Sequence, residues 1–451
     1  MKKILLILTL LLLLPTVLAD GMVVVKPYDT WHFHDEQQQL AAIDYKNGYQ
    51  DMILSIDINE IKGEKAVWLF PVPAQPERTV IDVVDEIPRY YGYDIKSLAD
   101  RRIREALMIM RLSQIYTFPL LGVRYYGRVH EDASVATLAK QAGVIVHERV
   151  EKYGLTTELI STKDGTVLWN YLTLKGLELP ETSRSVMNEY IGEDYSFVVS
   201  WISNSSEYKN GEYEGYQVGV SGKTAEPIKY YPNKRTIGVK ITFPTDKIYF
   251  PLKPTSVYES KRVPALIYVA GHVTPELYPE IELDSEVRYF SSYTYGFFNK
   301  AYSTGNDYTL IRINPPSKYL TQDLWIEDKV PTEVKTTKFF AKYPLAYGIL
   351  AFVLASMLAS LSAGLIFFRK DVSIIKLAFF GLWNFLTIIG VIIAVFFLKT
   401  KKIDEKLEQQ IKEKGLVIRA RDIRKLGFVI LFSIFFVVLT FILEYSLKLL
   451  V

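Results

Sequence analysis

Hydrophobic residues are concentrated near the two ends of this 451-residue chain. One apolar run covers residues 4–14, and three longer apolar segments cover residues 344–368, 373–398 and 426–450. A helix needs about 20 predominantly apolar residues to cross the hydrocarbon core of a membrane. The pattern therefore predicts transmembrane helices at 344–368 and 426–450, and a transmembrane or re-entrant helix at 373–398.

The first apolar run has the features of a signal peptide. Lys2 and Lys3 precede it, and the small residue Ala19 lies shortly after it. A charged start, a short apolar core and a small residue at the cleavage site are typical of exported proteins. We expect a signal peptide at 1–19, with an uncleaved anchor as the alternative. The expected location is the cytoplasmic membrane, with several spans and the large N-terminal domain outside.

Two rows of small residues recur every four positions along the first long segment. They are Ala351, Ala355, Ala359 and Ala363, and beside them Ser356, Ser360 and Gly364. Small residues at this spacing let another helix approach closely in lipid. The rows predict packing against the other two segments, with a homo-oligomer face as the alternative.

The loop at 399–425 conflicts with three full crossings. It holds ten basic residues, and basic loops normally stay in the cytoplasm. Three crossings from an external domain would put this loop outside. A re-entrant 373–398 segment removes the conflict; otherwise the loop is an exception. Its apolar residues recur every four positions, which predicts an amphipathic helix on the membrane surface or a solvated connector.

Polar residues are sparse in the three apolar segments. Asn384 lies in the second segment and is expected to hydrogen-bond to a neighbouring helix. Glu444 lies in the last third of the third segment, and we expect it to have no charge partner inside the membrane. So few polar groups favour an anchor over an ion or proton pathway.

The region between the ends begins with strand patterns. Residues 52–58 alternate with a period of two, and Asn47-Gly48 before them is a hairpin turn signal because both residues tolerate positive φ. Residues 66–70 form an apolar strand that is expected to end at Pro71 and Pro73.

Helix and further strand patterns follow. Apolar residues at helical spacing predict helices at 94–116 and 164–175. Strands are predicted at 197–201, 236–243, 263–269 and 287–298. This order predicts an exported α+β domain over residues 20–343, with a mixed or antiparallel sheet, followed by a C-terminal α-helical membrane domain. The α+β domain is either single or divided at about 20–190 and 191–330.

Several short motifs follow one another in an order that resembles one known family. They are WLFPVP (68–73), DG (164–165), YL (171–172), LP (179–180), YSFV (195–198), ITF (241–243), KIYFPL (247–252), TLIR (309–312) and LTQDL (320–324). The order resembles a family of secreted, often membrane-anchored prokaryotic proteins catalogued as domain of unknown function 2330, over most of residues 39–325. The resemblance implies a fold and an exported location, and it carries over no catalytic residue.

Composition excludes several kinds of chemistry. The chain contains no cysteine, so it has no disulfide, no thiolate metal site and no cysteine nucleophile. The net charge of +3 does not indicate nucleic acid as a partner. A cysteine-free exported chain rich in Lys, Glu, Ile and Tyr suits a heat-adapted prokaryote.

One short cluster has the residue types of a metal site. His32 and His34 lie two positions apart, so in a strand they share a face, and Glu36 would be a third ligand. An exposed polar strand is the alternative interpretation. No motif of catalytic quality occurs elsewhere, and we expect neither a cofactor nor an enzymatic activity.

Aromatic residues and arginines suggest a surface for a partner. The tetrapeptide RYYG occurs twice, which places Arg89, Tyr90 and Tyr91, and again Arg124, Tyr125 and Tyr126, in the same pattern. Exposed Tyr and Arg suit protein or glycan partners, whereas ordinary core packing is the alternative. Asn204 begins a glycosylation sequon.

Three functions fit these features. We favour a membrane-anchored cell-surface protein that binds, senses or scaffolds through its exported domain, in contact with membrane lipid. A membrane-tethered metal-dependent hydrolase using His32, His34 and Glu36 is the second hypothesis. An accessory subunit of a membrane complex is the third.

Overall fold

The computed structural model describes residues 23–26, 32–33, 39–56, 65–115, 148–208, 237–291, 307–398, 409, 413 and 420–451, apart from gaps at 86, 89, 91, 178–179, 193, 205–206 and 370–371. These residues form two compact units. The β unit contains the described residues up to Tyr93 and those at 148–291 and 307–331. The helical unit contains residues 94–115 and 332–451. The expected signal peptide and most of the 399–425 loop lie outside the described residues.

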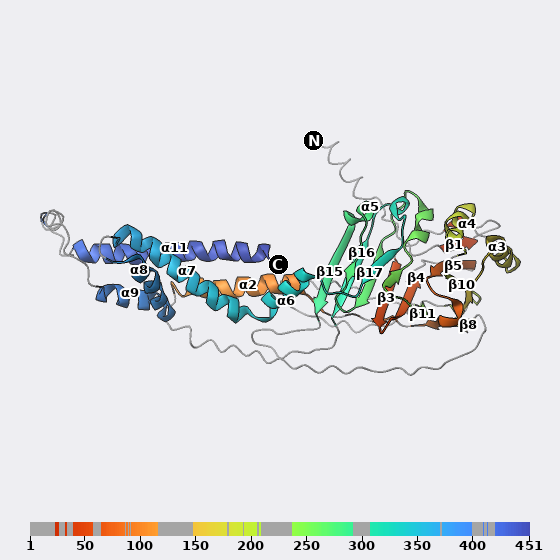
Figure 1. Cartoon of the computed structure of the whole chain (residues 1–451), viewed down its shortest axis with the longest axis horizontal. Helices are drawn as coiled ribbons and strands as arrows, with labels where there is room; N and C mark the ends of the chain where they lie inside the picture. Colours follow the sequence, from red (N-terminus) through yellow and green to blue (C-terminus); the bar gives the residue numbers. More distant parts are fainter. Residues whose placement is uncertain are drawn as a thin grey trace. The chain divides into compact units, whose positions relative to one another are not determined.

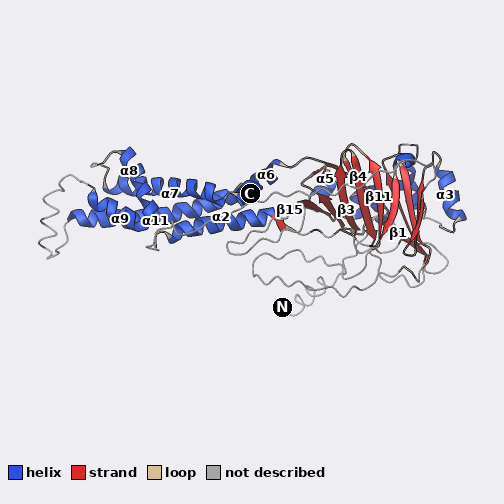
Figure 2. Ribbon diagram, turned by 90° about the horizontal axis from the view of Figure 1, so that it is seen from below, coloured by secondary structure: helices blue, strands red, loops and turns tan. Residues whose placement is uncertain are grey.

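Three sheets build the β unit (Figure 2). The six-stranded sheet has the order β2 (His32–Phe33), β1 (Val23–Lys26), β5 (Lys65–Val72), β10 (Ser196–Ile202), β9 (Leu155–Ile160) and β8 (Arg149–Lys152). The eight-stranded sheet has the order β6 (Val80–Val84), β11 (Gly238–Pro244), β4 (Tyr49–Ile56), β3 (Gln39–Lys46), β13 (Ala265–Ala270), β16 (Tyr308–Ile313), β15 (Ser285–Ser291) and β7 (Tyr93–Asp94). The third sheet contains β12 (Ile248–Phe250), β17 (Leu324–Glu327) and β14 (Thr274–Pro275). Because β3 and β13 are parallel while β3 and β4 are antiparallel, the eight-stranded sheet is mixed.

Local sequence signals explain the β3–β4 hairpin and the presence of Pro71 within strand β5. Asn47 and Gly48 join β3 to β4 with φ of 55° and 77°, which confirms the predicted turn. The strand at β5 runs past its expected end, since Pro71 pairs with Phe197 of β10. On its other side β5 pairs with β1 only as far as Trp68. Among the described residues it therefore has one neighbour beyond Trp68, as in an edge strand, where proline is tolerated.

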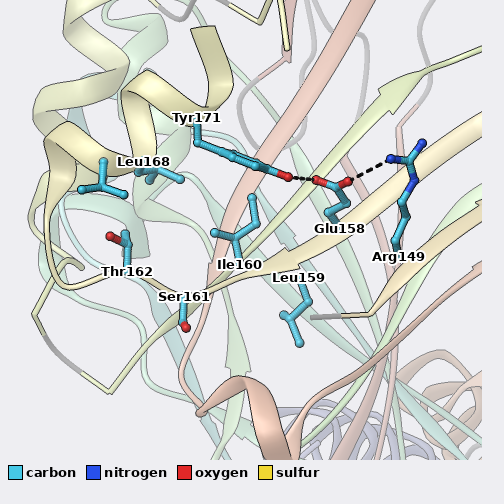
Figure 3. A pocket seen from close by; sticks show the side chains of 9 residues that line it. Arg149, Glu158, Leu159, Ile160, Ser161, Thr162, Leu168 and Tyr171 are labelled. Atoms are coloured by element: carbon cyan, nitrogen blue, oxygen red, sulfur yellow. Dashed lines mark hydrogen bonds and ion pairs between the residues drawn. The ribbon is translucent and has the colours of Figure 1, made fainter. Parts of the chain in front are cut away.

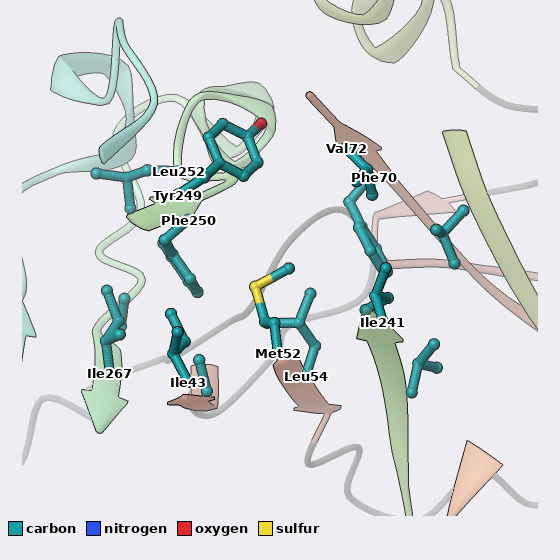
Figure 4. Close-up of a cluster of buried hydrophobic side chains, with 14 of the residues drawn as sticks. Ile43, Met52, Leu54, Phe70, Val72, Ile241, Tyr249, Phe250, Leu252 and Ile267 are labelled. Carbon is teal, nitrogen blue, oxygen red and sulfur yellow. The ribbon is translucent and has the colours of Figure 1, made fainter. Parts of the chain in front are cut away.

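All three sheets contribute to the main core of the β unit (Figure 4). Alternation along each strand turns every second residue inward, as in β11, where Val239, Ile241 and Phe243 are buried. The third sheet adds Tyr249 and Phe250, and both are fully enclosed.

Helices cover the outer face of the six-stranded sheet. They are α3 (Gly165–Leu174) and α4 (Glu181–Asn188), and Leu168, Leu172 and Met187 pack with Phe197 and Val199 of β10. The predicted helix at 164–175 is thus confirmed. The short helices of the β unit are η1 (Pro76–Arg78), η3 (Lys253–Tyr258), α5 (Pro279–Glu282) and η4 (Ser317–Tyr319).

The helical unit contains the predicted apolar segments. Its elements are α2 (Ile95–Leu112), α6 (Thr332–Lys342), α7 (Pro344–Phe367), α8 (Ile374–Phe380), η5 (Gly381–Leu386), α9 (Thr387–Phe397) and α11 (Ala420–Leu449) (Figure 1). Three stretches, Pro344–Phe367, Ile374–Phe397 and Asp422–Leu449, are long and apolar enough to cross a membrane. The expected α+β part followed by apolar C-terminal helices is therefore found.

One helix belongs to a different unit than we expected. The sequence predicts a helix at 94–116 inside the exported domain, but α2 packs with the apolar helices. Its inward residues Ile103, Leu107 and Met110 join a core that also contains Phe340 and Phe436. The difference arises because an amphipathic pattern reveals that a helix has a partner but does not reveal which partner.

A partly buried carboxylate joins separate parts of the β unit. Asp323 precedes β17 and accepts hydrogen bonds from the Tyr190 hydroxyl at 3.0 and 3.1 Å and from the Tyr249 hydroxyl at 3.0 Å. It also accepts one from the backbone N–H of Lys253 at 3.0 Å. Burial raises the pKa of Asp323, although these hydrogen bonds oppose the rise.

This network yields a prediction for Asp323 variants. Asp323→Ala leaves three donors without an acceptor, so we expect the free energy of unfolding to fall by about 2–4 kcal/mol. Because the folded-state pKa is raised, the contribution of this carboxyl to stability is fully present below its unfolded pKa and decreases as the pH rises through the folded value. The stability advantage of the native chain over Asp323→Asn should therefore shrink as the pH rises through this window. Chemical denaturation across this pH range tests this, and an advantage that grows with pH contradicts it.

Candidate functional site

A cavity of about 420 Å³ lies at the end of β9 beneath α3 in the β unit (Figure 3). One end is polar and contains Arg149, Glu158 and Tyr171. The remaining lining is mainly apolar, with two hydroxyl groups, and consists of Leu159, Ile160, Ser161, Thr162, Val167 and Leu168. Such a combination of an apolar wall and a few directed polar groups is typical of small-molecule sites.

The local sequence builds this cavity. Tyr153 and Gly154, both with positive φ, turn β8 back along β9, and the resulting register pairs Arg149 with Glu158. After β9, the Asp164 carboxylate accepts a hydrogen bond from the N–H of Thr166 and caps the start of α3. The helix then brings Leu168 and Tyr171 over the strand.

Glu158 is the centre of the polar end. Its side chain is 9% exposed and accepts a hydrogen bond from the Tyr171 hydroxyl. Lys175 Nζ lies 2.5 Å from Glu158 Oε1, and a guanidinium nitrogen of Arg149 lies 3.5 Å from the same oxygen. Lys175 Nζ also lies 4.7 Å from the ring centroid of Trp201. The carboxylate is thus held by one hydroxyl and two cations.

The protonation states follow from these contacts. Burial, and then the hydrogen bond to Glu158, raises the pKa of Tyr171, so its hydroxyl remains a donor at neutral pH. Burial opposes the charge of Lys175, but hydrogen bonds to Glu158 and Tyr171 outweigh this and raise the pKa of the lysine. Tyr171 and Lys175 are therefore hydrogen-bond donors to Glu158.

Arg149 differs from the other cation. Its side chain is 56% exposed, and its two ionic contacts, with Glu158 and Glu151, are both 3.5 Å long. A guanidinium carries five N–H donors, and long exposed pairs contribute little energy. Arg149 therefore retains donors for a ligand at the polar end of the cavity.

The residues of the suggested metal cluster are only partly described. His32 lies in β2, whereas His34 and Glu36 lie outside the described residues. Elsewhere His272 is buried, with Nε2 at 2.8 Å from the carbonyl oxygen of Phe290. Within the described ranges no three His, Asp or Glu side chains come together in a way that would hold a metal ion.

The suggested partner surface is also only partly described. Arg89, Tyr91, Arg124, Tyr125 and Tyr126 lie outside the described residues. Tyr90 is half-buried against Tyr268 and Tyr308, with ring centroids 5.2 Å away in both cases. Burial raises the pKa of Tyr90 to about 12. Asn204 follows β10, and its glycosylation remains a prediction.

The two rows of small residues face other segments of the same chain. All seven residues are buried, and they are Ala351, Ala355, Ala359, Ala363, Ser356, Ser360 and Gly364. The Ser360 hydroxyl donates to the carbonyl oxygen of Leu377 at 2.6 Å. A Cβ atom on Gly364 would lie 2.7 Å from the Leu377 side chain. A homo-oligomer remains a prediction.

The middle apolar segment is interrupted inside the helical unit. After α8 the backbone tightens into η5, and Thr387 then has a φ of 63°, which L residues rarely adopt. A break of this kind leaves backbone groups without helical partners. The N–H of Ile388 finds an acceptor in the carbonyl oxygen of Ser113, 3.2 Å away, directly after α2.

A chain of polar side chains passes through the same place. The Ser433 hydroxyl of α11 donates to Gln114 Oε1 at 3.2 Å, and Gln114 Nε2 donates to Asn384 Oδ1 at 2.9 Å. Asn384 Nδ2 donates to the Ser356 hydroxyl of α7 at 3.1 Å. We name these four residues the polar core; they join α11, the turn that follows α2, η5 and α7.

Glu444 has two charge partners, whereas we expected none. Arg111 of α2 lies 2.7 Å from one carboxylate oxygen, and Lys448 lies 2.7 Å from the other. The Arg111 guanidinium also lies 4.1 Å from the ring centroid of Phe441. This pair was missed because Arg111 is 333 residues away, in a helix that we expected in the exported domain.

Comparisons with protein families, with curated proteins and with solved structures find no match to this chain.

Removal of the Asn384 side chain should weaken the helical unit. Asn384→Ala deletes the bonds to Gln114 and Ser356, so we expect the free energy of unfolding to fall by about 1–2 kcal/mol. Titration of the detergent-solubilised protein with sodium dodecyl sulfate, followed by circular dichroism, measures the loss. Thr440→Ala is the matched control, because among the described residues the Thr440 hydroxyl bonds to the carbonyl oxygen of Val437 in its own helix and to no other group. An equal loss in both variants would contradict the role of the polar core.

Proposed function

We propose that this protein is a membrane-anchored cell-surface protein that binds a small amphipathic anion through its β unit. The cavity at β9 and α3 is the observation that carries the proposal. Its polar end offers the exposed Arg149, and its wall offers Ile160 and Leu168. The order of motifs that resembles the domain of unknown function 2330 family is consistent with an exported binding protein.

The charges favour an anionic over a cationic ligand. Glu158 is already held by Tyr171 and Lys175 and has little exposed area, so it is poorly placed to accept a cation from a ligand. Arg149 has the opposite properties, because it is exposed and its ion pairs are long. A carboxylate on an apolar body would pair with Arg149 and lay its apolar part along α3.

The two other hypotheses have less support. The described residues contain no convergent metal ligands, so no observation favours the hydrolase over the binding protein. The accessory-subunit hypothesis rested on the small-residue face of α7, which is buried within this chain.

Binding of phenylacetate to the full-length protein in detergent tests the proposal. Isothermal titration calorimetry should show binding to the native protein. We expect Arg149→Gln to weaken it at least tenfold, which corresponds to about 1.4 kcal/mol.

Two controls test whether the charge of the ligand and the charge of Arg149 are responsible for binding. Phenylacetamide has the same ring but no charge, so it should bind at least tenfold more weakly than phenylacetate. Arg312→Gln removes an exposed arginine from β16, away from the cavity residues, and should leave binding unchanged. Equal binding of the two compounds, or no binding of phenylacetate, would overturn the proposal.

A further inference from the structure

Both ends of the middle apolar segment lie at the same end of the helical unit. The segment follows α7 after a short turn, and it ends near the start of α11, where Lys425 Nζ donates to the carbonyl oxygen of Phe396 at 2.8 Å. Arg424 of α11 donates to the carbonyl oxygen of Phe367 at the end of α7. The ends of α7 and α9 and the start of α11 are therefore neighbours, and we name this the loop end.

The segment travels inward along α7 and then turns back. Leu377 contacts Gly364, a Cβ on Gly381 would collide with the carbonyl oxygen of Ser356, and the Phe385 ring lies 6.4 Å from that of Phe352. The contacts thus move steadily toward the start of α7. Phe352 lies fifteen residues before the end of α7, which is roughly 22 Å at 1.5 Å per residue. The segment is therefore a hairpin that reaches past the middle of α7.

Gly390 shows where the hairpin closes. A Cβ there would lie 2.0 Å from the carbonyl oxygen of Trp383, so α9 passes directly against η5. From Gly390 the helix returns to Phe396 at the loop end.

The α2 helix approaches the hairpin from the opposite direction. Arg111 pairs with Glu444 near the end of α11, and Gln114 reaches Ser433 near its middle. In both views of the helical unit, α6 lies toward one end and α8 and α9 lie toward the other (Figures 1 and 2). Beyond α2, Ser113 and Gln114 meet the tip of the hairpin.

The outward face of α2 changes character along its length. In the first part the exposed residues are Lys96, Ser97 and Arg104, whereas in the last part they are Met108 and Leu112, followed by Ile115 just after the helix. Ile115 is 82% exposed. A helix entirely in water has no reason to expose only apolar residues over its last two turns, but a helix that enters hydrocarbon does.

The neighbouring helices expose the same kind of surface. Ile349 and Leu350 of α7 and Ile434 and Val438 of α11 point outward and are between 48% and 60% exposed. The apolar end of α2 thus continues the surface of two helices that are long enough to cross a membrane. Because this surface is continuous, we infer that lipid covers the apolar end of α2.

We propose that α2 and the α8–α9 hairpin enter the membrane from opposite faces and meet at the polar core, so that of the described helices only α7 and α11 cross it. The lipid surface then begins between Arg104 and Met108 on α2. The 399–425 loop lies on the opposite side of the membrane from the β unit, where its basic residues satisfy the positive-inside rule. Irregular backbone at mid-depth is tolerated because α2 and the hairpin cover it with protein.

Depth along α2 can be measured with nitroxide labels. The chain has no cysteine, so single variants at Ser97, Arg104, Met108 and Leu112 of the full-length protein can be labelled directly. The protein is reconstituted into vesicles of phosphatidylcholine and phosphatidylglycerol at 3:1. We expect accessibility to a water-soluble nickel chelate to fall several-fold between Arg104→Cys and Met108→Cys, and accessibility to oxygen to rise.

Two other results would overturn the entry of α2. High nickel accessibility at all four positions would mean that α2 lies in water. Low accessibility to both reagents at Met108→Cys and Leu112→Cys would mean that a second protein copy, not lipid, covers this face. All four positions are exposed, so these substitutions leave the core intact.

The side of the membrane on which Gln409 lies provides a test of the hairpin that is independent of the labels on α2. A membrane-impermeant maleimide is applied to intact cells that carry Gln409→Cys or Leu283→Cys, the latter on a residue of the β unit that is 97% exposed. We expect Leu283→Cys to react in intact cells and Gln409→Cys to react only after lysis. Reaction of both in intact cells would mean three full crossings and would overturn the hairpin. This outcome is independent of ligand binding by the β unit.

Discussion

Backbone and polar groups inside an apolar bundle must find partners within the protein, and this constraint governs the helical unit. The interruption between α8 and α9 frees the N–H of Ile388, and the end of α2 supplies its acceptor. Gln114 and Asn384 complete the arrangement by linking α2 to η5. Without α2, the break would lack its acceptor, so an amphipathic helix is an essential part of an otherwise apolar bundle.

Two enclosed carboxylates of the β unit, Asp323 and Glu158, have different surroundings. Asp323 is surrounded by neutral donors, two tyrosine hydroxyls and one backbone N–H, and burial raises its pKa. Glu158 is paired with Lys175 and lies at the edge of a cavity beside an exposed arginine. The first arrangement joins elements that are distant in sequence, and the second leaves donors directed at open space. This contrast is why the second is the candidate site.

Sequence patterns predicted those turns and helices that are determined by residues close together in the sequence. Asn47-Gly48 specifies its turn because both residues tolerate positive φ, and the period along 164–175 specifies α3. No comparable sequence pattern indicated the candidate cavity. Arg149, Glu158 and Tyr171 resemble ordinary surface residues until the β8–β9 register and the position of α3 bring them together.

The sequence by itself determined that the chain has long apolar helices behind a strand-rich region, because composition and period are properties of short segments. Tertiary structure alone decided which unit α2 belongs to, how the 374–397 segment turns, and what pairs with Glu444. Those answers depend on contacts across more than two hundred residues, such as Arg111 with Glu444. An amphipathic pattern shows that a helix packs against another element, but only the tertiary structure shows which element that is.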